Sequence, residues 1–460
     1  MSLIVSISGI RGTVGGVPEE NFTPLDVFRF SYAYASWILK NNSDNPHIVI
    51  GRDARISGLM VSQIVTGTLL SMGIKVTDLG LSTTPTVEIA VPEENADGGI
   101  IITASHNPKE WNALKLLNRK GEFISSADGE WIKEEVGKNN YCFSGIDKIG
   151  SYRQDNSYIR KHIDKILQLP LVDIESIKKK NFKVVIDCVN STGGIALPEL
   201  LERLGVSEVV ELYCTPDGKF PHNPEPLPQN LFAIASEVKL NKAHLGIVVD
   251  PDVDRLLFIC EDGDFFGEEY TLVAVADYVL KNTPGNTVSN LSSTRALRDV
   301  TQKHGCQYFA SAVGEVNVVE MMKQNNAIIG GEGNGGIIYP ELHYGRDAMV
   351  GIALFLSHLA KSNKTASTLR ASYPQYFMSK SKIELTPEID IDHLITCMKE
   401  KYKNQPQNSI DGLKIEFENE WVHLRKSNTE PIIRIYTESQ SQATSDFLAN
   451  KIISDLNSFI

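Results

Sequence analysis

Three stretches of the chain repeat one order of hydrophobic patterns: a short apolar run, a segment with apolar residues at helical spacing, and a second apolar run. In the first stretch, residues 47–53 (HIVIGRD) predict a strand, residues 57–72 a helix and residues 75–80 a second strand. Strands rich in Val and Ile that alternate with helices are typical of parallel sheets covered on both faces. This stretch therefore predicts an α/β domain.

The second and third stretches have the same order. In the second, the apolar runs 182–188 and 209–213 enclose a predicted helix, Gly193 to Leu204. In the third, predicted helices 294–304 and 316–323 alternate with the runs TVSNLSS, QYFASAV and AIIGG. A glycine follows the helices that end at residues 204 and 304, which suits a left-handed C-cap. The repetition predicts three similar α/β domains with parallel or mixed sheets.

The pattern changes beyond about residue 370. Residues 410–439 have the alternation of successive strands, and Ser441 to Leu456 predicts one helix after them, which suits a smaller α+β domain. A chain of 460 residues exceeds the size at which one hydrophobic core stops growing. We therefore expect four domains, at residues 1–150, 151–255, 256–370 and 371–460.

The composition indicates a soluble globular protein, with 42% hydrophobic and 22% charged residues. A net charge of −12 argues against binding to nucleic acid or to a membrane surface, although a local basic cleft could still collect an anionic substrate. The six cysteines form no CxxC pair, which is typical of reduced thiols in an intracellular protein. The N-terminus lacks a signal-peptide pattern, and nowhere do 18 apolar residues run together. We expect a cytoplasmic protein.

The first candidate for chemistry is Ser105, in the segment TASHNP (residues 103–108) that follows the apolar run 98–102. This position places Ser105 and His106 where a buried strand meets a loop, and open α/β sheets bind ligands at the carboxyl ends of their strands. The pattern predicts an exposed, reactive hydroxyl. By itself the tripeptide SHN favours the alternative, a turn serine that only hydrogen-bonds nearby backbone. A functional role for Ser105 therefore depends on the other motifs of the chain.

A second candidate site contains three aspartates, Asp250, Asp252 and Asp254, after the apolar run 245–249. In a tight loop at a strand end their carboxylates can converge on one cation. Oxygen ligands with open coordination positions suit Mg²⁺ better than a closed calcium cage. The spacing of an EF-hand is absent. The alternative is a solvated acidic turn.

A third candidate is the glycine-rich segment 330–336 (GGEGNGG), which follows a predicted strand. Its glycines allow close backbone approach to a ligand, while Glu332 and Asn334 can bond sugar hydroxyls. The alternative is a flexible linker. Farther along, Asp347 precedes an apolar helix (349–359) and is predicted to be its structural N-cap.

The fourth candidate is the segment RKSNTEPIIR, residues 425–434. Its two arginines offer forked donors, and its turn offers hydroxyl, amide and backbone donors; the residues are Arg425, Ser427, Asn428, Thr429 and Arg434. Together these groups predict a nest for a phosphate.

These four motifs, in this order, resemble those of the α-D-phosphohexomutase superfamily, which includes phosphoglucomutases, phosphomannomutases and phosphoglucosamine mutases. The resemblance spans nearly the whole chain. It implies four domains around a central cleft and a phosphoserine at Ser105. It also implies Mg²⁺ bound by Asp250, Asp252, Asp254 and the phosphoserine oxygen.

The resemblance implies roles for the other motifs as well. Glu332 and Asn334 would bind the sugar, and the segment 425–434 would bind a phosphate. The N-terminal SGIRG motif puts Arg11 near the phosphoserine, and Lys115 matches the lysine of the family's NGxK pattern.

The sequence departs from the family pattern at several positions. Asn334 replaces the usual bacterial serine, and Asn428 replaces a glycine, although Asn tolerates left-handed backbone. Ala113 replaces the glycine before Lys115. His222 and Asn223 are transposed relative to the family, so we assign them no ligand role.

The implied reaction moves a phosphoryl group between O6 and O1 of a hexose phosphate, through a hexose 1,6-bisphosphate that also serves as activator. Arg11 and Arg255 would neutralise charge, and Lys115 or His106 would move the proton, Lys115 only if neighbouring cations lower its pKa. Our first choice is a phosphoglucosamine mutase, and the alternative is a bifunctional phosphoglucomutase/phosphomannomutase. A sugar-phosphate phosphatase and a non-catalytic sensor are more remote. The expected partner is a sugar phosphate, without nucleic acid or membrane, for a monomer or homodimer.

Overall fold

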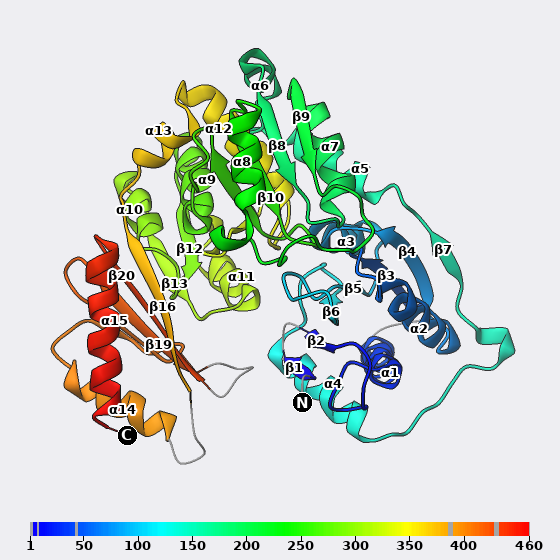
Figure 1. The fold of residues 1–460 in the computed structure, drawn as a ribbon. Coiled ribbons are helices and arrows are strands. Elements are labelled where there is room, and N and C mark those ends of the chain that lie inside the picture. The colour runs from blue at the N-terminus through cyan, green and yellow to red at the C-terminus, as the bar shows by residue number, and fades with distance from the viewer. Residues whose placement is uncertain (1–2, 7–8, 42–44, 385–389, 427–431, 460) are drawn as a thin grey trace. The chain divides into compact units, whose positions relative to one another are not determined.

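A computed structural model describes residues 3–6, 9–41, 45–384, 390–426 and 432–459 (Figure 1). The chain forms two compact units. Unit 1 contains Met1–Tyr278 and Asn334–Arg370, and unit 2 contains Val279–Gly333 and Ala371–Ile460. None of the described helices is both long and apolar enough to span a bilayer.

The first sheet of unit 1 has seven strands in the order β1-β2-β6-β5-β3-β4-β7. The strands are β1 (Ile4–Ser6), β2 (Gly9–Thr13), β3 (His47–Arg52), β4 (Lys75–Leu81), β5 (Gly98–Ile102), β6 (Trp111–Asn118) and β7 (Tyr152–Gln154). The helices of this part are α1 (Pro24–Asn41), α2 (Gly58–Ser71), α3 (Thr84–Glu93) and α4 (Ser126–Gly137). β3 is parallel to β4 and β5, whereas β6 is antiparallel to both β5 and β2. The sheet is therefore mixed.

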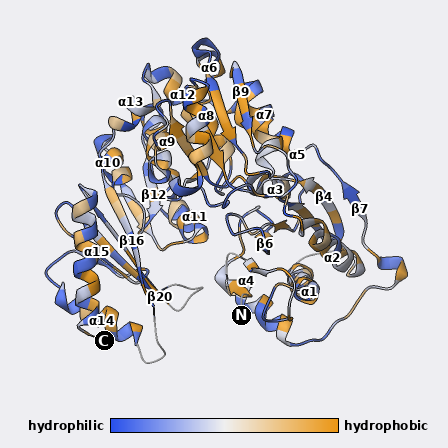
Figure 2. Cartoon of the chain, in the orientation of Figure 1, coloured by the Kyte–Doolittle hydropathy of each residue, from blue (hydrophilic) through white to orange (hydrophobic). Residues whose placement is uncertain are grey.

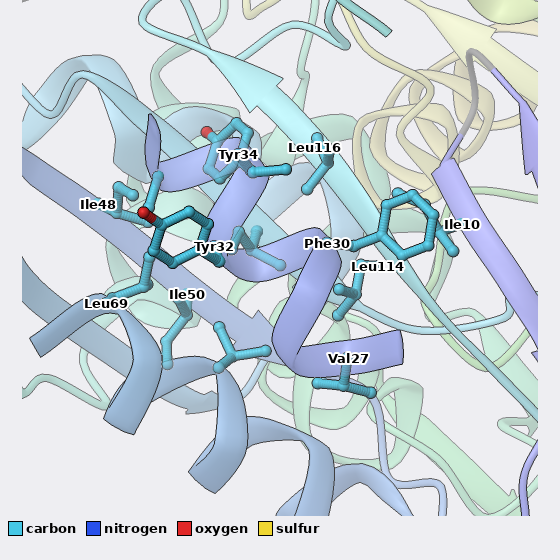
Figure 3. Packing of buried hydrophobic residues seen from close by; sticks show 14 of the residues in the cluster. Ile10, Val27, Phe30, Tyr32, Tyr34, Ile48, Ile50, Leu69, Leu114 and Leu116 are labelled. Atoms are coloured by element: carbon cyan, nitrogen blue, oxygen red, sulfur yellow. The ribbon is translucent and has the colours of Figure 1, made fainter. Parts of the chain in front are cut away.

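The core of this region packs α1 against the sheet (Figure 3). Phe30 and Tyr34 of α1 belong to the same buried cluster as Ile50 of β3 and Leu114 of β6. The Tyr34 hydroxyl also donates to the carbonyl oxygen of Leu117 at 2.6 Å. Burying one Phe, Ile or Leu side chain of this cluster contributes about 1.5–3 kcal/mol to stability. The packing fixes the central strands, at whose ends the candidate residues lie.

The second sheet of unit 1 has the order β11-β10-β8-β9. Its strands are β8 (Lys183–Asp187), β9 (Glu208–Leu212), β10 (Leu245–Val249) and β11 (Leu256–Cys260). The helices in this part of the chain are α5 (Tyr158–Gln168), α6 (Ile174–Lys180), α7 (Gly193–Leu204) and α8 (Phe232–Leu240). β11 is antiparallel to β10, while β8 is parallel to both β10 and β9. The predicted helix 193–204 is confirmed with its bounds, and Gly205 caps it at a φ of +83°.

The remaining elements between residues 268 and 371 include helices α9 (Glu268–Asn282), α12 (Ala348–Ser362) and α13 (Ala366–Ala371), and strand β15 (Gly336–Ile338). Short 3₁₀ turns occur at Ile146–Lys148 and Pro228–Asn230. The predicted N-cap Asp347 is confirmed, because its carboxylate accepts from the backbone N–H groups of Met349 and Val350.

Unit 2 contains parallel strands in the order β13-β12-β14, formed by β12 (Asn286–Asn290), β13 (Tyr308–Ser311) and β14 (Ala327–Glu332). Their helices are α10 (Ala296–Lys303) and α11 (Glu315–Gln324). An antiparallel sheet of order β16-β20-β19-β18-β17 follows. It comprises β16 (Phe377–Glu384), β17 (Gln407–Asn408), β18 (Leu413–Glu416), β19 (Trp421–Lys426) and β20 (Ile432–Ser439), with helices α14 (Ile391–Lys401) and α15 (Gln442–Asn457).

Figure 2 shows the hydropathy that the sequence pattern predicted: strands beside α8 are largely hydrophobic, whereas α15 carries hydrophobic and hydrophilic residues side by side. All five residues of β10 are buried. The buried residues of α15, among them Leu448 and Ile452, recur every three or four positions, about once per helical turn. The predicted fold class, three α/β domains and a smaller α+β domain, is confirmed.

Candidate active site

Ser105 lies in the turn after β5, with its hydroxyl directed at a carboxylate. Its Oγ donates to Oδ2 of Asp250, 2.6 Å away, and Nδ1 of His106 lies 3.4 Å from the same Oγ. The backbone φ of Ser105 is +47°, an uncommon conformation for a non-glycine residue that the surrounding structure must enforce. The prediction of an exposed hydroxyl is wrong, since Ser105 is only 7% exposed. Its hydroxyl instead contacts Asp250 of the aspartate loop.

The turn around Ser105 is held by Arg55, which the sequence analysis missed. Arg55 is 1% exposed, and its Nη1 donates to the carbonyl oxygens of Pro108 (2.7 Å) and Trp111 (2.9 Å). Its Nη2 donates to the carbonyl oxygens of Ser105 and Asn107. Asp53, whose Oδ2 lies 3.0 Å from Nε of Arg55, balances the charge. A planar guanidinium with five donors suits this set of carbonyls.

The three predicted metal ligands converge. Asp250, Asp252 and Asp254 are each 0% exposed, and one ligand oxygen from each lies within 4.8 Å of the other two. They follow β10, whose carboxyl end positions the loop. Asp252 also accepts a hydrogen bond from the hydroxyl of Thr84, and its backbone oxygen accepts from Thr84 N at 2.8 Å. The alternative of a solvated acidic turn is excluded by this burial.

Two cations face these carboxylates. Nζ of Lys115 lies 2.7 Å from Oδ2 of Asp252 and 3.3 Å from Oδ2 of Asp254, while Nη2 of Arg346 lies 2.8 Å from that Asp254 oxygen. Arg346 is a second residue that the sequence analysis missed as part of the site. Its only sequence signal was its place beside the cap residue Asp347.

The carboxylate cluster fits a hard cation. Within the part of the chain that the structure describes, Oδ1 of Asp252 and Oδ1 of Asp254 are buried and accept no hydrogen bond. A buried carboxylate oxygen without a partner is costly, and a divalent cation bound by oxygen would remove that cost. The donor set therefore fits Mg²⁺.

The proton-transfer candidates differ in their electrostatics. Burial opposes the charge of Lys115, but the attraction of Asp252 and Asp254 outweighs it and raises the pKa of Lys115. Its stated condition for acting as a base, a pKa lowered by neighbouring cations, is therefore not met here. Burial and then the charge of Arg255 hold the pKa of His106 well below its usual value, so its imidazole is neutral. Because Arg255 can only donate, to Nε2 at 3.4 Å, the His106 proton lies on Nδ1.

Arg11 lies on β2, where its register partner on β6 is Ala113. Its charge is one of those that lower the pKa of His106. Unit 1 thus brings together most of the predicted residues: Arg11, Ser105, His106, Lys115, Asp250, Asp252, Asp254 and Arg255.

The other candidates belong to different parts of the chain. Glu332 ends β14 in unit 2 and is 5% exposed; its Oε1 accepts from Nδ2 of Asn290 at 2.9 Å and from Gly314 N at 3.1 Å. Arg425 of β19 and Arg434 of β20 are register partners in the same unit. Asn334 belongs to unit 1, where its Oδ1 accepts from Gly336 N at 3.3 Å. Ser427, Asn428 and Thr429 lie outside the described residues.

Four family models match the chain in order. They are described as phosphoglucomutase/phosphomannomutase alpha/beta/alpha domain I (residues 3–141), domain II (160–263), domain III (267–376) and the C-terminal domain (392–454).

Relatives match over nearly the whole chain. A phosphoglucomutase/phosphomannomutase of Thermococcus kodakarensis is 36% identical over 437 residues, 94% of each chain. A phosphoglucosamine/phosphogalactosamine mutase of Sulfurisphaera tokodaii is 32% identical over 459 residues, 98% of each chain. The crystal structure of a phosphoglucomutase/phosphomannomutase family protein from Burkholderia thailandensis is similar in fold, with a TM-score of 0.83, 23% identity, and coverage of 99% of this chain and 98% of that one.

Proposed function

Since this chain belongs to the phosphoglucomutase/phosphomannomutase family, we propose that it is a phosphohexomutase that moves a phosphoryl group between O6 and O1 of a hexose phosphate. The observation that carries the proposal is the Ser105 hydroxyl, held 2.6 Å from Asp250 in a buried cluster of three carboxylates. A hydroxyl beside a cation-binding cluster suits phosphoryl transfer, in which positioning and charge neutralisation supply most of the catalysis.

In the proposed reaction Ser105 carries the phosphoryl group. A sugar hydroxyl oxygen attacks phosphorus, the bond from phosphorus to the Ser105 oxygen breaks, and the hydroxyl proton passes to a base. The product of this half-reaction is a hexose 1,6-bisphosphate. After the sugar turns round, its other phosphoryl group returns to Ser105 by the reverse step.

Lys115 and His106 are the two groups proposed to handle protons in this step. His106 carries its ring proton on Nδ1, 3.4 Å from the Ser105 oxygen, so it is placed to donate a proton to that oxygen as the bond to phosphorus breaks. Lys115 would accept the proton of the sugar hydroxyl only in a state in which Asp252 and Asp254 no longer raise its pKa. Arg11 and Arg255 are proposed to neutralise the transferred group. Glu332 and Asn334 are proposed to bind sugar hydroxyls, and Arg425, Arg434 and the turn of Ser427, Asn428 and Thr429 to bind the phosphate that does not react.

Mg²⁺ is proposed to be bound by the three aspartates and a phosphoserine oxygen. When bound, the ion would polarise the phosphoryl oxygens and neutralise their charge. The two carboxylate oxygens without hydrogen-bond partners, on Asp252 and Asp254, support this assignment.

Mg²⁺ binding should stabilise the protein. At a free concentration of about 100 times its dissociation constant, a cation that binds only the folded state adds about 2.7 kcal/mol to the free energy of unfolding. We expect this increment in urea unfolding of the native enzyme and its loss in Asp252→Asn. Asp262→Asn, which changes an exposed aspartate in the turn after β11, should keep it. An increment of the same size in both variants would contradict the site.

A turnover assay tests the reaction itself. The protein would be incubated with glucosamine 6-phosphate and a trace of hexose 1,6-bisphosphate, and phosphorus NMR would follow the products. A mutase forms the 1-phosphate isomer without net release of phosphate. A phosphatase would release inorganic phosphate without forming the isomer, and a sensor would form neither.

Glucosamine phosphate is the proposed substrate, as for the relative from Sulfurisphaera tokodaii, which is named a phosphoglucosamine/phosphogalactosamine mutase. The second candidate is the bifunctional activity, favoured by the name of the Thermococcus kodakarensis relative. We expect kcat/KM for glucosamine phosphate to exceed the values for glucose and mannose phosphates by at least about tenfold. This is the lower limit of the discrimination that an enzyme usually achieves between substrates that differ by one chemical group. A smaller preference would favour the bifunctional mutase.

A further inference from the structure

Two routes of polar contacts in unit 2 join Glu332 to strand β19, which carries Arg425 and is labelled in Figure 1. The first route passes through Asp411. Its Oδ2 accepts from Val313 N at 3.0 Å and lies 3.8 Å from Nη1 of Arg425. The next residue after Val313 is Gly314, whose N–H donates to Oε1 of Glu332 at 3.1 Å. One carboxylate therefore contacts both the arginine and the backbone that holds Glu332.

The second route passes through His423, two residues before Arg425 on the same strand. Its Nδ1 lies 2.8 Å from the hydroxyl of Ser292, and Ser292 N donates to Oδ1 of Asn290 at 2.9 Å. Nδ2 of Asn290 donates to Oε1 of Glu332 at 2.9 Å. Both routes thus end on the same oxygen of Glu332.

His423 also closes the two routes into a ring, because its Nε2 lies 2.7 Å from the backbone oxygen of Asp411. A carbonyl oxygen can only accept, so the His423 proton lies on Nε2 and Nδ1 accepts from the hydroxyl of Ser292. Burial lowers the pKa of His423 to about 4, which keeps the imidazole neutral and this direction of bonding fixed at neutral pH. His423 is 1% exposed and Asn290 5%. Ser292 and Asp411 are half-buried. Hydrogen bonds joined in one network can be worth more than the same bonds taken separately.

We propose that Asp411, His423 and Ser292 are positioning residues, which couple phosphate recognition at Arg425 to hydroxyl recognition at Glu332. The inference rests on the proposed function, in which these two residues bind the substrate. A mutase must bind its sugar in two opposite orientations. In each of them Arg425 would bind the phosphate that does not react, and Glu332 would bind sugar hydroxyls. The ring fixes the distance between Arg425 and Glu332. The sugar therefore finds its phosphate-binding and hydroxyl-binding residues at the same separation in both orientations. Coupling between two sites is reciprocal, so each ligand group strengthens the binding of the other.

The ring can be tested without a ligand. Ser292→Ala removes only the hydroxyl that His423 accepts from. Hydrogen exchange at the amides of Val313 and Gly314, which lie on the opposite route, should then speed up about fivefold, within the range of coupling in one network. The matched control is Ser289→Ala, which removes a hydroxyl from the same stretch, one that contacts the hydroxyl of Tyr308 at 2.9 Å. Exchange that changes less than twofold in Ser292→Ala, or equally in both variants, would overturn the ring.

A binding experiment tests the coupling. In a Ser105→Ala background, which is expected not to turn over, the affinity for glucosamine 6-phosphate would be measured for Glu332→Gln, Arg425→Lys and the double variant. With the ring intact, the factor by which the double variant raises Kd should differ about fivefold from the product of the two factors for the single variants. When Asp411→Asn and Ser292→Ala are added to every variant, the factor for the double variant should equal the product of the two single factors to within twofold. An unchanged departure would overturn the coupling.

The two failures can be told apart. If no hexose phosphate binds to the Ser105→Ala parent, the proposed function fails, while the hydrogen-exchange comparison still decides whether the ring exists. If hexose phosphates bind but the single effects multiply even with the ring intact, the proposed function stands and the inference fails.

Discussion

Ser105→Ala is expected to lower mutase activity at least about a thousandfold, because the variant has no oxygen to carry the phosphoryl group. Folding should be little affected: the variant loses the hydrogen bond to Asp250, which contributes about 0.5–1.5 kcal/mol, and the longer contact with Nδ1 of His106. The measurement is the rate of isomer formation, together with intact-mass analysis after incubation with a hexose bisphosphate. The native protein should gain the mass of one phosphoryl group, and the variant should not.

The control for this prediction is Ser236→Ala. Ser236 lies exposed on α8, where its hydroxyl donates only to the carbonyl oxygen of Phe232 at 2.9 Å among the described residues. This variant should keep full activity and gain the phosphoryl group. Full activity in Ser105→Ala would contradict the central assignment.

Arg55→Met is expected to cost about 3–5 kcal/mol of unfolding free energy, as when one partner of a buried ion pair is removed. The substitution deletes donors to the carboxylate of Asp53 and to four backbone oxygens of the segment 105–111, and it leaves the buried Asp53 carboxylate without its cationic partner. Activity should fall as well, since the turn that holds Ser105 at a positive φ loses its support. Urea unfolding and the turnover assay measure the two effects.

Arg52→Met provides the comparison. Arg52 is half-buried and ends β3, and its Nη1 donates to the carbonyl oxygen of Asp53 at 3.3 Å. Its replacement should cost about 1 kcal/mol or less. Equal losses in the two variants would show that Arg55 has no special part in holding the turn.

The hydrophobic pattern was sufficient to predict the fold class, because burial imposes a period on each helix and strand. Helix 193–204 was predicted to the residue, since a glycine suited to a left-handed cap follows it. Parallel or mixed sheets were predicted, but not which strands pair antiparallel. β6 and β11 run antiparallel to their neighbours, yet they are as apolar as the parallel strands, and hydropathy does not encode direction.

The candidate site was predictable where chemistry requires an unusual local composition, as in the three aspartates. Arg55 and Arg346 escaped prediction because arginine is ordinarily a surface residue, and nothing nearby in the chain indicates that either is enclosed. Their partners come from distant segments: Arg55 contacts residues 105–111, and Arg346 contacts Asp254. Such contacts exist only after the sheets have formed. The exposure of Ser105 was mispredicted for the same reason, since its partner Asp250 follows a strand of the other sheet.

The path of the chain through its two compact units has a consequence for biosynthesis. The chain leaves unit 1 after Tyr278 and returns at Asn334, and it leaves again after Arg370. Domains fold as units while the polypeptide emerges from the ribosome. Unit 1 therefore lacks part of its structure until residue 370 has emerged, although its first sheet is complete long before. Residues 279–333 remain incomplete for longer, until the C-terminal strands and helices have been translated. Until then Leu291 and Ser292 lack their partners Lys414 and His423. A premature stop codon in the last ninety residues would therefore leave unit 1 complete, but residues 279–333 without the remainder of unit 2.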